Sequence, residues 1–488
     1  MKLEFSKEFY KDEEREGFLV KSMVKRSWAL QMEILSYIDE ICERHDIQYF
    51  AFWGTMLGAV RHKGFVPWDD DMDIIMKRND YEKFIEIARD ELPVGYILLS
   101  IYSEQEWDTT ISRITNSYSI DYNEESLLKS HGCPYICGID IFPYDYIPDD
   151  KKKFDEMENI LNGAAQAKDI CKKQKALSEE GRKLEKKDEK RLDVILKDLE
   201  KRFGFTFSRD NYLQNQLLCL FDSAGASYGD SSCEFMTNHL ERRERVSKSS
   251  DFRVPTFLLD EVIDYPFEGY SVKIPKYYEI CLSKCYGKNF MTPIQGGGAH
   301  DYPFYSKQEK TITDLGKLEE VLCAVDSVAD KIGVDNDSSK PEKISEALIE
   351  ENQELRQLIM GWKQPDKKAI LCCFSIMDAY ESEEKFVKKL KDTIDFFKNQ
   401  TDKICMILLV APYVEEILAR KSAALSEEYI NLMNSMIQSE WALAVFPDQY
   451  YGIVDLCDAY YGSPNEYIKP FQDAKKPIMV QNLDILNS

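Results

Sequence analysis

The sequence lacks any apolar run long enough to cross a bilayer. Its longest largely apolar stretches, residues 369–377 and 404–411, are less than half of the roughly 20 residues that a membrane-spanning helix needs. No positively charged stretch followed by apolar residues comes after Met1, as a secretory leader would require. These absences predict a cytoplasmic protein without a transmembrane segment.

The chain is also poor in positive charge and in organised cysteine. Lys and Arg total 63 against 87 Asp and Glu, and the resulting net charge of −24 argues against a nucleic-acid partner. The 13 cysteines form no CxxC pair and no Cys/His cluster, so we expect reduced thiols and no structural zinc site. Hydrophobic residues, at 44%, suffice for packed cores, and 488 residues allow two or three domains.

Residues 49–60 have the pattern of a phosphate-binding junction. Residues 49–53 are aromatic or small and predict a short buried strand, Gly54 and Thr55 predict a turn, and residues 56–60 predict the start of a helix. Such a junction leaves backbone N–H groups pointing at one spot, where a phosphate can bind. Cationic and donor side chains follow directly: Arg61, His62 and Lys63.

An acidic run, residues 69–73, follows Trp68. Side chains two apart on a strand share a face, so Asp71 and Asp73 can reach one metal ion together. Two carboxylates opposite an N–H-rich turn suit Mg²⁺ and a nucleotide phosphate. The alternative is a solvated acidic turn, but the position between Trp68 and an Ile-Ile pair favours the metal site.

The stretch GTMLGAVRHKGFVPWDDDMDI resembles the signature of the LicD family of phosphocholine transferases, which includes the fukutin-related proteins. The resemblance covers roughly residues 28–305. It implies a nucleotidyltransferase fold in which Gly54 and Thr55 match the turn that faces the donor. It also implies that Asp71 and Asp73 match the pair that binds Mg²⁺ or Mn²⁺, with a third carboxylate on a neighbouring strand.

The predicted strand 135–143 carries a candidate for that third carboxylate. Alternation places Gly138, Asp140 and Phe142 on one face, and a carboxylate among such apolar neighbours is unfavourable unless a cation pairs with it. The alternative is an Asp that caps the following turn. The stretch IDIFP resembles an element of the same family, and Asp140 matches its third carboxylate. Asp145 is expected in the loop that leads away from the strand.

Two further residues are candidates by the resemblance. Arg113 lies in a predicted strand, 111–115, and a lone Arg on a strand is usually a surface residue. The family has a basic residue in this vicinity, so the resemblance implies that Arg113 binds a donor phosphate. The family also places a His in a loop beyond the domain's last helix, where His300 follows three glycines. That loop could close over a nucleotide, or it could be a flexible exit from the domain.

The rest of the chain divides by composition. Residues 1–305 are expected to form the catalytic domain, with a helical insertion at about 151–224 whose two Lys/Glu-rich helices split near 176–181. Its basic runs could face an anionic polymer, but the interleaved acids favour a solvated surface. Residues 306–364 predict a helical linker with near-heptad apolar spacing, which allows a short self-associating helix and a homo-oligomer.

Residues 365–488 alternate apolar strands with amphipathic helices, which predicts a parallel sheet covered on both faces, a Rossmann-like α/β domain. Its last part, residues 455–464 and 476–479, loosely resembles the nucleotide-binding half of GT-B glycosyltransferases. It lacks the Glu-rich donor-binding features of active members, so we expect an accessory or glycan-recognition role. The whole chain is therefore expected to be an α/β protein.

The resemblance implies a transferase that moves phosphocholine from a CDP-linked donor, CDP-choline, to a sugar hydroxyl of a lipopolysaccharide, teichoic acid or other cell-surface glycan precursor. Asp71, Asp73 and Asp140 would hold one or two Mg²⁺ or Mn²⁺ ions, and Asp140 would help to remove the hydroxyl proton. Gly54 and Thr55 would bind the phosphate, while Arg61 or Lys63 would offset the charge of the leaving CMP. A lipid-linked acceptor would imply peripheral membrane association.

Two alternatives remain open at this point. The same scaffold could transfer phosphoribitol, phosphoglycerol or a nucleotide. The chain could also be a non-catalytic adaptor in glycan assembly, although the presence of Asp71, Asp73 and Asp140 argues against that.

Overall fold

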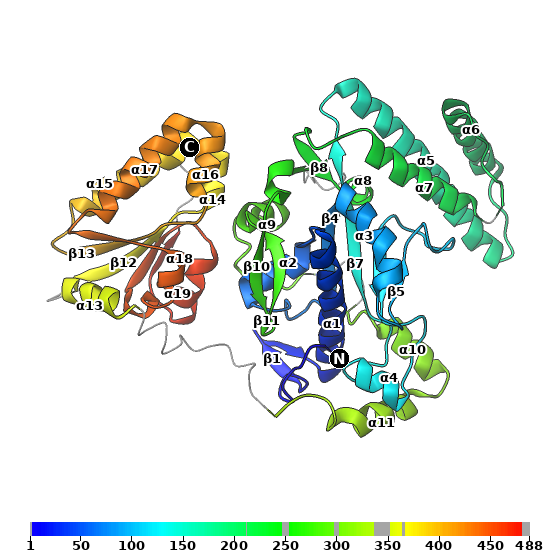
Figure 1. The fold of residues 1–488 in the computed structure, drawn as a ribbon, viewed down its shortest axis with the longest axis horizontal. Coiled ribbons are helices and arrows are strands. Elements are labelled where there is room, and N and C mark those ends of the chain that lie inside the picture. Colours follow the sequence, from blue (N-terminus) through cyan, green and yellow to red (C-terminus); the bar gives the residue numbers. More distant parts are fainter. Residues whose placement is uncertain are drawn as a thin grey trace. The chain divides into compact units, whose positions relative to one another are not determined.

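The computed structural model describes residues 2–210, 212–245, 253–296, 302–335, 352–363 and 367–480. It is a mixed α/β protein, as predicted (Figure 1). The chain forms two compact units: Met1–Lys276 with Gly296–Ser339, and Tyr277–Gln295 with Lys340–Ser488. His300 lies outside the described residues. None of the helices in the described ranges is both long and apolar enough to span a membrane.

The first unit is built on a seven-stranded sheet with the order β3-β4-β7-β6-β5, to which β8 and β9 add beside the end of β7. Its two central strands, β4 and β7, are parallel, and the other pairs are antiparallel. The strands are β3 (Phe50–Ala51), β4 (Met72–Lys77), β5 (Ile97–Leu99), β6 (Ser112–Thr115), β7 (Gly138–Ile147), β8 (Phe235–Thr237) and β9 (Val254–Pro255).

Helices pack on this sheet through apolar stripes. The helix α1 (Ser22–His45) contacts β7 and α3 (Arg78–Glu91), and α2 (Trp53–His62) contacts β4. The helix α1 is buried on all sides from Val24 to Leu35, and beyond that point only on the face of Ile38, Ile41 and Cys42. The unit also contains the helices α4 (Glu124–Lys129) and α8 (His239–Arg245), the hairpin β1 (Glu13–Arg15) and β2 (Phe18–Val20), and the hairpin β10 (Val262–Phe267) and β11 (Tyr270–Pro275).

The start of α2 differs from the expected strand, turn and helix. The strand β3 has only two residues, and α2 already begins at Trp53, so Gly54 and Thr55 lie in its first turn. Phe52 ends the strand because its N–H donates to the carbonyl of Asp73 (3.1 Å) and its own carbonyl accepts from Met56 (3.2 Å) as the first helical bond. The predicted turn is thus the N-terminus of the helix itself.

Two other local predictions were wrong. The sequence also predicts a short strand at residues 120–122, but these residues form none, because Asp121 instead accepts bonds from Asn123 and Ser126 at the start of α4. Asp145 is not in a loop: β7 continues to Ile147, and Asp145 is buried there against Arg78. A buried ion pair replaces the solvent that a loop carboxylate would need.

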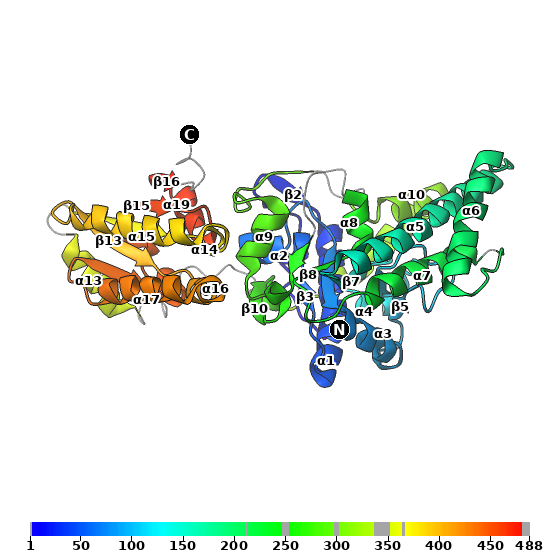
Figure 2. The same ribbon diagram turned by 90° about the horizontal axis from the view of Figure 1, so that it is seen from above.

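The insertion forms three helices, α5 (Lys151–Glu179), α6 (Lys186–Phe203) and α7 (Leu213–Ser227), drawn side by side in Figure 2. It has its own apolar core, which includes Leu161, Leu196 and Leu217. Asp222 of α7 joins the insertion to the sheet by accepting two bonds, each 3.0 Å, from Arg78. The two helices predicted before residue 203 are confirmed, with the break at residues 180–185.

The second unit contains the predicted parallel sheet, with the order β14-β13-β12-β15-β16. The helices α15 and α17 pack together on one side, and α13, α18 and α19 lie on the other (Figure 1). Its strands are β12 (Lys368–Cys373), β13 (Ile404–Leu409), β14 (Ala442–Val445), β15 (Ala459–Gly462) and β16 (Ile478–Val480). Its helices are α13 (Gln353–Trp362), α14 (Ile376–Glu381), α15 (Glu383–Lys398), α16 (Val414–Lys421), α17 (Ala423–Ile437), α18 (Pro447–Tyr450) and α19 (Lys469–Asp473).

The division between the units differs from the expected boundaries at residues 305 and 365. The helix α9 (Tyr278–Tyr286) belongs to the second unit, where Tyr277 donates to Glu416 (2.8 Å). The helices α10 (Ser306–Asp314) and α11 (Leu318–Ala329), expected in a linker, belong to the first unit. Positions 344 and 348 of the near-heptad pattern lie outside the described residues.

Candidate active site

Asp73 and Asp140 are neighbours on the two central strands. In the parallel pair of β4 and β7, Asp73 lies directly opposite Asp140. Paired residues on adjacent strands project from the same face of a sheet, so the two carboxylates are held side by side. Apolar residues on the opposite face of these strands, such as Ile74 and Ile139, are fully buried and fix both strands to the core.

Arg113 completes this row from the third strand. It lies opposite Asp140 in the antiparallel pair of β6 and β7, and its guanidinium binds both carboxylate oxygens, with Nη2 2.6 Å from Oδ2. Burial alone would lower the pKa of Arg113, but the bonds to Asp140 and the charges of Asp73 and Asp71 raise it. Gly138 makes room for this side chain, because a Cβ there would lie 2.9 Å from Cγ of Arg113.

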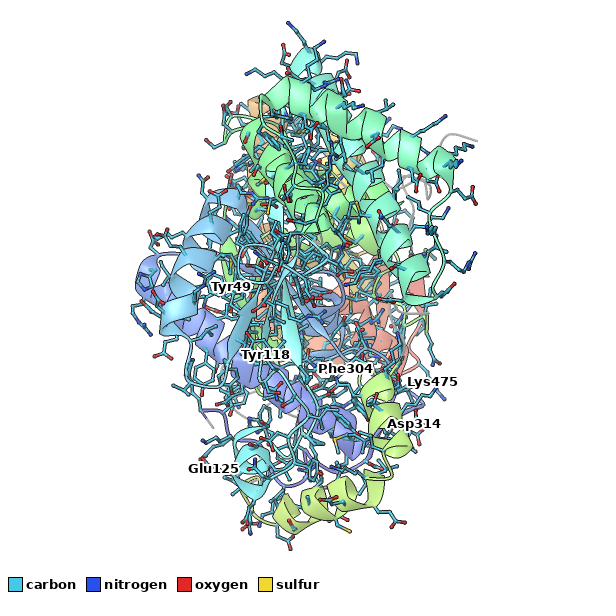
Figure 3. All side chains as sticks on the ribbon, turned by 90° about the vertical axis from the view of Figure 1, so that its right-hand side faces the viewer. Tyr49, Tyr118, Glu125, Phe304, Asp314 and Lys475 are labelled. Atoms are coloured by element: carbon cyan, nitrogen blue, oxygen red, sulfur yellow. The ribbon has the colours of Figure 1, made fainter. Side chains whose placement is uncertain are left out.

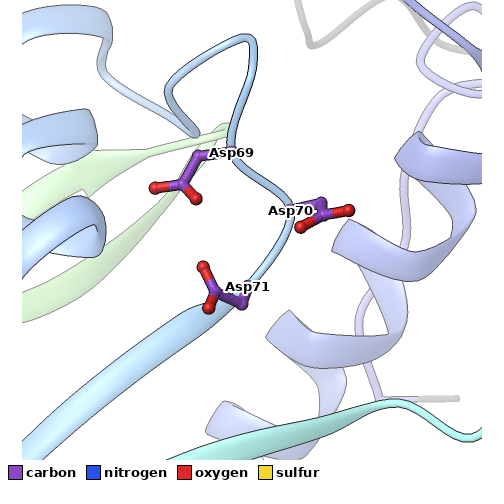
Figure 4. A group of neighbouring side chains, drawn as sticks. All are labelled: Asp69, Asp70 and Asp71. Carbon is purple, nitrogen blue, oxygen red and sulfur yellow. The ribbon is translucent and has the colours of Figure 1, made fainter. Parts of the chain in front are cut away.

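A loop of three aspartates lies before β4 (Figure 4). One oxygen from each of Asp69, Asp70 and Asp71 lies within 4.8 Å of the others. The carboxylates of Asp69 and Asp71 approach each other, whereas that of Asp70 points to the other side of the loop (Figure 4). There Asp70 is buried and its Oδ2 accepts a bond from the N–H of Phe304 (2.6 Å). Asp69 and Asp71 are therefore the two residues of the loop that can act together with Asp73.

Two side chains of α1 hydrogen-bond to the backbone of the acidic loop. Trp28 Nε1 donates to the carbonyl of Asp69 (3.2 Å), and Gln31 Nε2 donates to the carbonyl of Asp70 (2.7 Å). Trp28 is itself stacked on Phe65, with ring centroids 4.5 Å apart. The position of the carboxylates is thus set by buried side chains rather than by the loop alone.

The N-terminus of α2 faces the same carboxylates. The hydroxyl of Thr55 accepts a bond from the N–H of Asp73 (2.9 Å), which ties the first turn of α2 to β4. A Cβ on Gly54 would lie 2.2 Å from Oδ2 of Asp69, so a glycine is needed for this approach. Trp53, the first residue of α2, has a φ of 40° and packs edge-on against Phe142. Such a backbone conformation is unfavourable for a non-glycine residue and persists where the surrounding contacts enforce it.

The carboxylates repel one another. Burial, followed by the charges of Asp71, Asp140, Asp69 and Glu241, raises the pKa of Asp73 well above its usual range. Glu241 is placed near the site by Asn238, which accepts from the N–H of Glu241 (3.0 Å) and donates to the carbonyl of Pro143 (2.9 Å). Several half-buried oxygen ligands with excess negative charge are the ligand set that Mg²⁺ or Mn²⁺ prefers. The residues fit a divalent cation.

Six of the residues predicted from the sequence come together here: Gly54, Thr55, Asp71, Asp73, Arg113 and Asp140. Arg61 and Lys63 lie at the other end of α2, roughly 13 Å away along its axis. Arg61 is buried beside His62 and the ring of Trp68, and Lys63 Nζ donates to Tyr265 (2.9 Å).

Three residues near the site were not predicted from the sequence. Asp69 stands two residues before Asp71, so the same alternation that selects Asp71 and Asp73 also applies to Asp69, although it was not selected. Glu241 reaches the site through the cap of α8, which no local pattern reveals. Tyr302 packs against Phe18, with centroids 5.5 Å apart, and burial together with Asp70 and Asp69 raises its pKa. The segment that begins at Tyr302 includes Phe304, whose position on the first unit is labelled in Figure 3.

The second unit has a different arrangement where its strand order reverses, at the ends of β12 and β15. Parallel sheets commonly bind ligands at such a point. Here Ser375 donates to Glu279 of α9, and Tyr278 of α9 donates to Glu466. Gly462 lets the two strand ends approach, since a Cβ there would lie 1.7 Å from the carbonyl oxygen of Cys373. The helix α9 therefore covers this edge of the sheet.

Comparisons with known proteins match the part of the chain that holds the carboxylates. Residues 46–154 match the family described as LicD/FKTN/FKRP, nucleotidyltransferase domain, and this range contains Asp71, Asp73, Arg113 and Asp140. The chain is 26% identical over 274 residues to the lipopolysaccharide cholinephosphotransferase LicD of Haemophilus influenzae, covering 56% of this chain and 93% of that protein. An uncharacterized protein of Rickettsia typhi is 36% identical over 64 residues, which are 13% of this chain and 21% of that protein.

Proposed function

The chain carries a domain of the LicD family, and on that premise we propose that it transfers phosphocholine from CDP-choline to a hydroxyl of a cell-surface glycan precursor. The similarity to a lipopolysaccharide cholinephosphotransferase supports the substituent and the glycan acceptor. The observation that carries the proposal is the register of three strands. It places Arg113, Asp140 and Asp73 in one row on one face of the sheet.

Each part of the site has a role in this reaction. A divalent cation, Mg²⁺ or Mn²⁺, bound by Asp71, Asp73 and Asp140 would offset the negative charge of the donor's pyrophosphate. The N–H groups in the first turn of α2 are directed toward the same region and favour a bound phosphate. Thr55 keeps Asp73 in place, and Arg113 can donate to a phosphate oxygen next to Asp140.

The transfer itself is a displacement at phosphorus. The acceptor oxygen forms a bond to the phosphorus of phosphocholine while the bond from that phosphorus to CMP breaks, and CMP leaves with the electron pair. The hydroxyl proton passes to a carboxylate, which we assign to Asp140. Its side chain retains 21% exposure, so an acceptor can approach it from solvent.

The test measures CMP release by the full-length protein with Mg²⁺, a lipopolysaccharide acceptor and one CDP-linked donor at a time. We expect release from CDP-choline, and no release from CDP-ribitol or CDP-glycerol. Asp73→Asn is the inactive control, and Asp90→Asn, which removes an exposed carboxylate from α3, is the matched active control.

Each other outcome identifies an alternative. Release from CDP-ribitol or CDP-glycerol alone would mean that the same site carries a different phospho-substituent. No release from any donor, together with no binding of CDP in calorimetry, would indicate a non-catalytic adaptor and would refute the proposal.

A further inference from the structure

Three aromatic side chains from separate segments of the first unit meet beside the acidic loop. Phe18 of β2 packs edge-on against Trp68, with ring centroids 6.3 Å apart, and against Tyr302, with centroids 5.5 Å apart. Phe18 and Trp68 are half-buried, and Tyr302 is 38% exposed. These three side chains are the aromatic group. Partly exposed rings that gather in this way leave apolar surface in water, which is typical of a ligand site.

The aromatic group and the acidic loop contact the same helix. Near the end of α2, Arg61 lies over the ring of Trp68, 5.9 Å from its centroid, and His62 packs edge-on against that ring (6.4 Å). At the start of α2, a Cβ on Gly54 would lie 2.2 Å from Oδ2 of Asp69, the residue that follows Trp68. Gly54 and Arg61 are about 10 Å apart along the helix axis. A nucleotide has a similar length from its phosphate to its base.

Two further contacts hold the other rings of the aromatic group in place. Arg15 lies opposite Phe18 in the hairpin of β1 and β2, and its Nη2 binds Oε2 of Glu268 (3.1 Å). Two residues after Tyr302, the N–H of Phe304 donates to a carboxylate of the acidic loop (2.6 Å). Side chains that are already held in position lose little freedom when a ligand stacks on them, which favours binding.

The strand order indicates which part of the donor would reach the aromatic group. On one side of β4 lies β7 with Asp140, the carboxylate assigned to the acceptor's proton, and on the other side lies β3, which leads into α2. The attacking and leaving oxygens of a displacement at phosphorus lie roughly in line, on opposite sides of the phosphorus. An acceptor beside Asp140 therefore directs the leaving CMP toward α2 and Trp68. The choline would stay near the phosphorus, because only two carbons join it to its phosphate.

We infer that the aromatic group binds the nucleobase of the donor, which stacks on Trp68. The inference rests on the proposed function, because it takes CMP to be the leaving group. Bases commonly bind to proteins by stacking on aromatic side chains, since every base has an apolar face. The base would cover ring surface that is in contact with water in the free protein.

The test is calorimetric titration of the full-length protein, in the presence of Mn²⁺, with CMP and with ribose 5-phosphate, which lacks the base. Trp68→Ala should weaken the binding of CMP by roughly tenfold or more and leave that of ribose 5-phosphate unchanged. Trp68→Phe, which keeps a ring, should retain most of the affinity for CMP. Phe18→Ala and Tyr302→Ala test the same surface from other segments of the chain and should also weaken CMP binding. In Trp68→Ala the KM for CDP-choline should rise, while the KM for the lipopolysaccharide acceptor should not.

Matched controls come from exposed side chains of the same unit. Leu19→Ala changes the neighbour of Phe18 on the other face of β2, where Leu19 is 52% exposed, and Tyr118→Ala removes a ring that is 67% exposed. Both controls should bind CMP as the wild type does.

The outcomes separate this inference from the proposed function. Unchanged CMP affinity in all three alanine variants, or equal losses for CMP and ribose 5-phosphate, would overturn the inference and leave the transfer reaction standing. A rise in the KM for the acceptor alone would also overturn it, because the rings would then bind the glycan. Binding of CMP that depends on the rings, in a protein that releases no CMP from CDP-choline, would support the base site and refute phosphocholine transfer.

Discussion

Arg113 and Asp140 form a two-bond ion pair across neighbouring strands, so one of the carboxylates proposed to bind a cation already has a cation beside it. Asp73 lies on the other side of Asp140 in the same row. A metal ion that binds Asp140 must therefore compete with a guanidinium. Replacing Arg113 should therefore change the affinity of the site for a metal ion.

We expect Arg113→Gln to bind Mn²⁺ about two- to fivefold more tightly than the wild type, because a half-exposed ion pair no longer competes for Asp140. It should bind CDP-choline more weakly, because a donor to the phosphate is lost. Calorimetric titration with Mn²⁺ and then with CDP-choline measures both effects. Arg113→Lys, which keeps the charge but not the fork of two bonds, is the control. Unchanged affinities in Arg113→Gln would show that this ion pair has only a structural role.

Asp71→Asn and Asp73→Asn should each lower the rate of CMP release by roughly two orders of magnitude or more, because each removes a charge from the cation site and little volume. Addition of EDTA should abolish release by the wild type, and Mg²⁺ or Mn²⁺ should restore it. Circular dichroism should show unchanged folds. Rates within a few-fold of the wild type in both variants would rule out the assignment of the metal ligands.

In metal-free buffer, Asp73→Asn and Asp140→Asn should change the melting temperature in opposite directions. The pKa of Asp73 is raised in the folded state, so its ionisation destabilises the protein as the pH rises above the unfolded pKa, and Asn removes that charge. Asp140→Asn leaves Arg113 without its partner and should lower the melting temperature slightly. Thermal melts at neutral pH, with and without Mn²⁺, measure the difference. A lower melting temperature in Asp73→Asn would show that its repulsion is already compensated without metal.

Gly54→Ala should lower activity strongly although alanine is the better helix former by about 1 kcal/mol. The new Cβ would lie 2.2 Å from Oδ2 of Asp69 and must displace that carboxylate. Gly361→Ala in α13, where a Cβ meets nothing within 4 Å, is the matched control and should only stabilise its helix. If Gly54→Ala retains full CMP release, Asp69 does not contribute to the site.

Glu279 should make the stability of the second unit depend on pH. Burial, aided by Glu466 and Asp378, raises its pKa from 4.5 to about 8, so the protonated form is the one that folding favours. The stability should be highest below about pH 4.5 and should fall as the pH rises toward 8. Glu279→Gln should flatten this dependence, while Asp448→Asn, an exposed change in the same unit, should not. Melting temperatures from pH 5 to pH 9 provide the measurement, and equal slopes for both variants would contradict the expectation.

Sequence patterns predicted which residues belong to the candidate site, but not which side chains would lie next to one another. Asp71 and Asp73 were selected by the alternation expected of one strand, although Asp71 lies in the loop just before β4. Asp140 was selected as a polar residue among apolar neighbours. The register between β4 and β7 does not follow, because it is set by packing between strands far apart in the chain. For the same reason the sequence suggested Asp140 as the poorly compensated carboxylate. In the structure Arg113 binds the carboxylate of Asp140, whereas burial and neighbouring carboxylates disfavour the charged form of Asp73.

Tertiary contacts also account for the other differences. The short strand β3 ends early because the carbonyl of Phe52 already accepts the first helical bond of α2, from Met56. Asp145 stays within β7 because Arg78 pairs with it, and the same guanidinium also binds Asp222 of the insertion. Arg61 was expected near the phosphate because it follows Gly54 and Thr55 closely in the sequence. In the structure these residues lie at opposite ends of α2, so Arg61 is far from the phosphate position.

The assignment of α9 to the second unit means that the two units are interleaved along the chain. The polypeptide passes from the first unit to the second after Lys276, returns at Gly296 and leaves again after Ser339. A chain ending near residue 307 would therefore contain α9 without the sheet on which it folds, and Glu279 without Ser375. No single breakpoint in the gene separates the units, so shuffling of this architecture in evolution requires the exchange of both segments together.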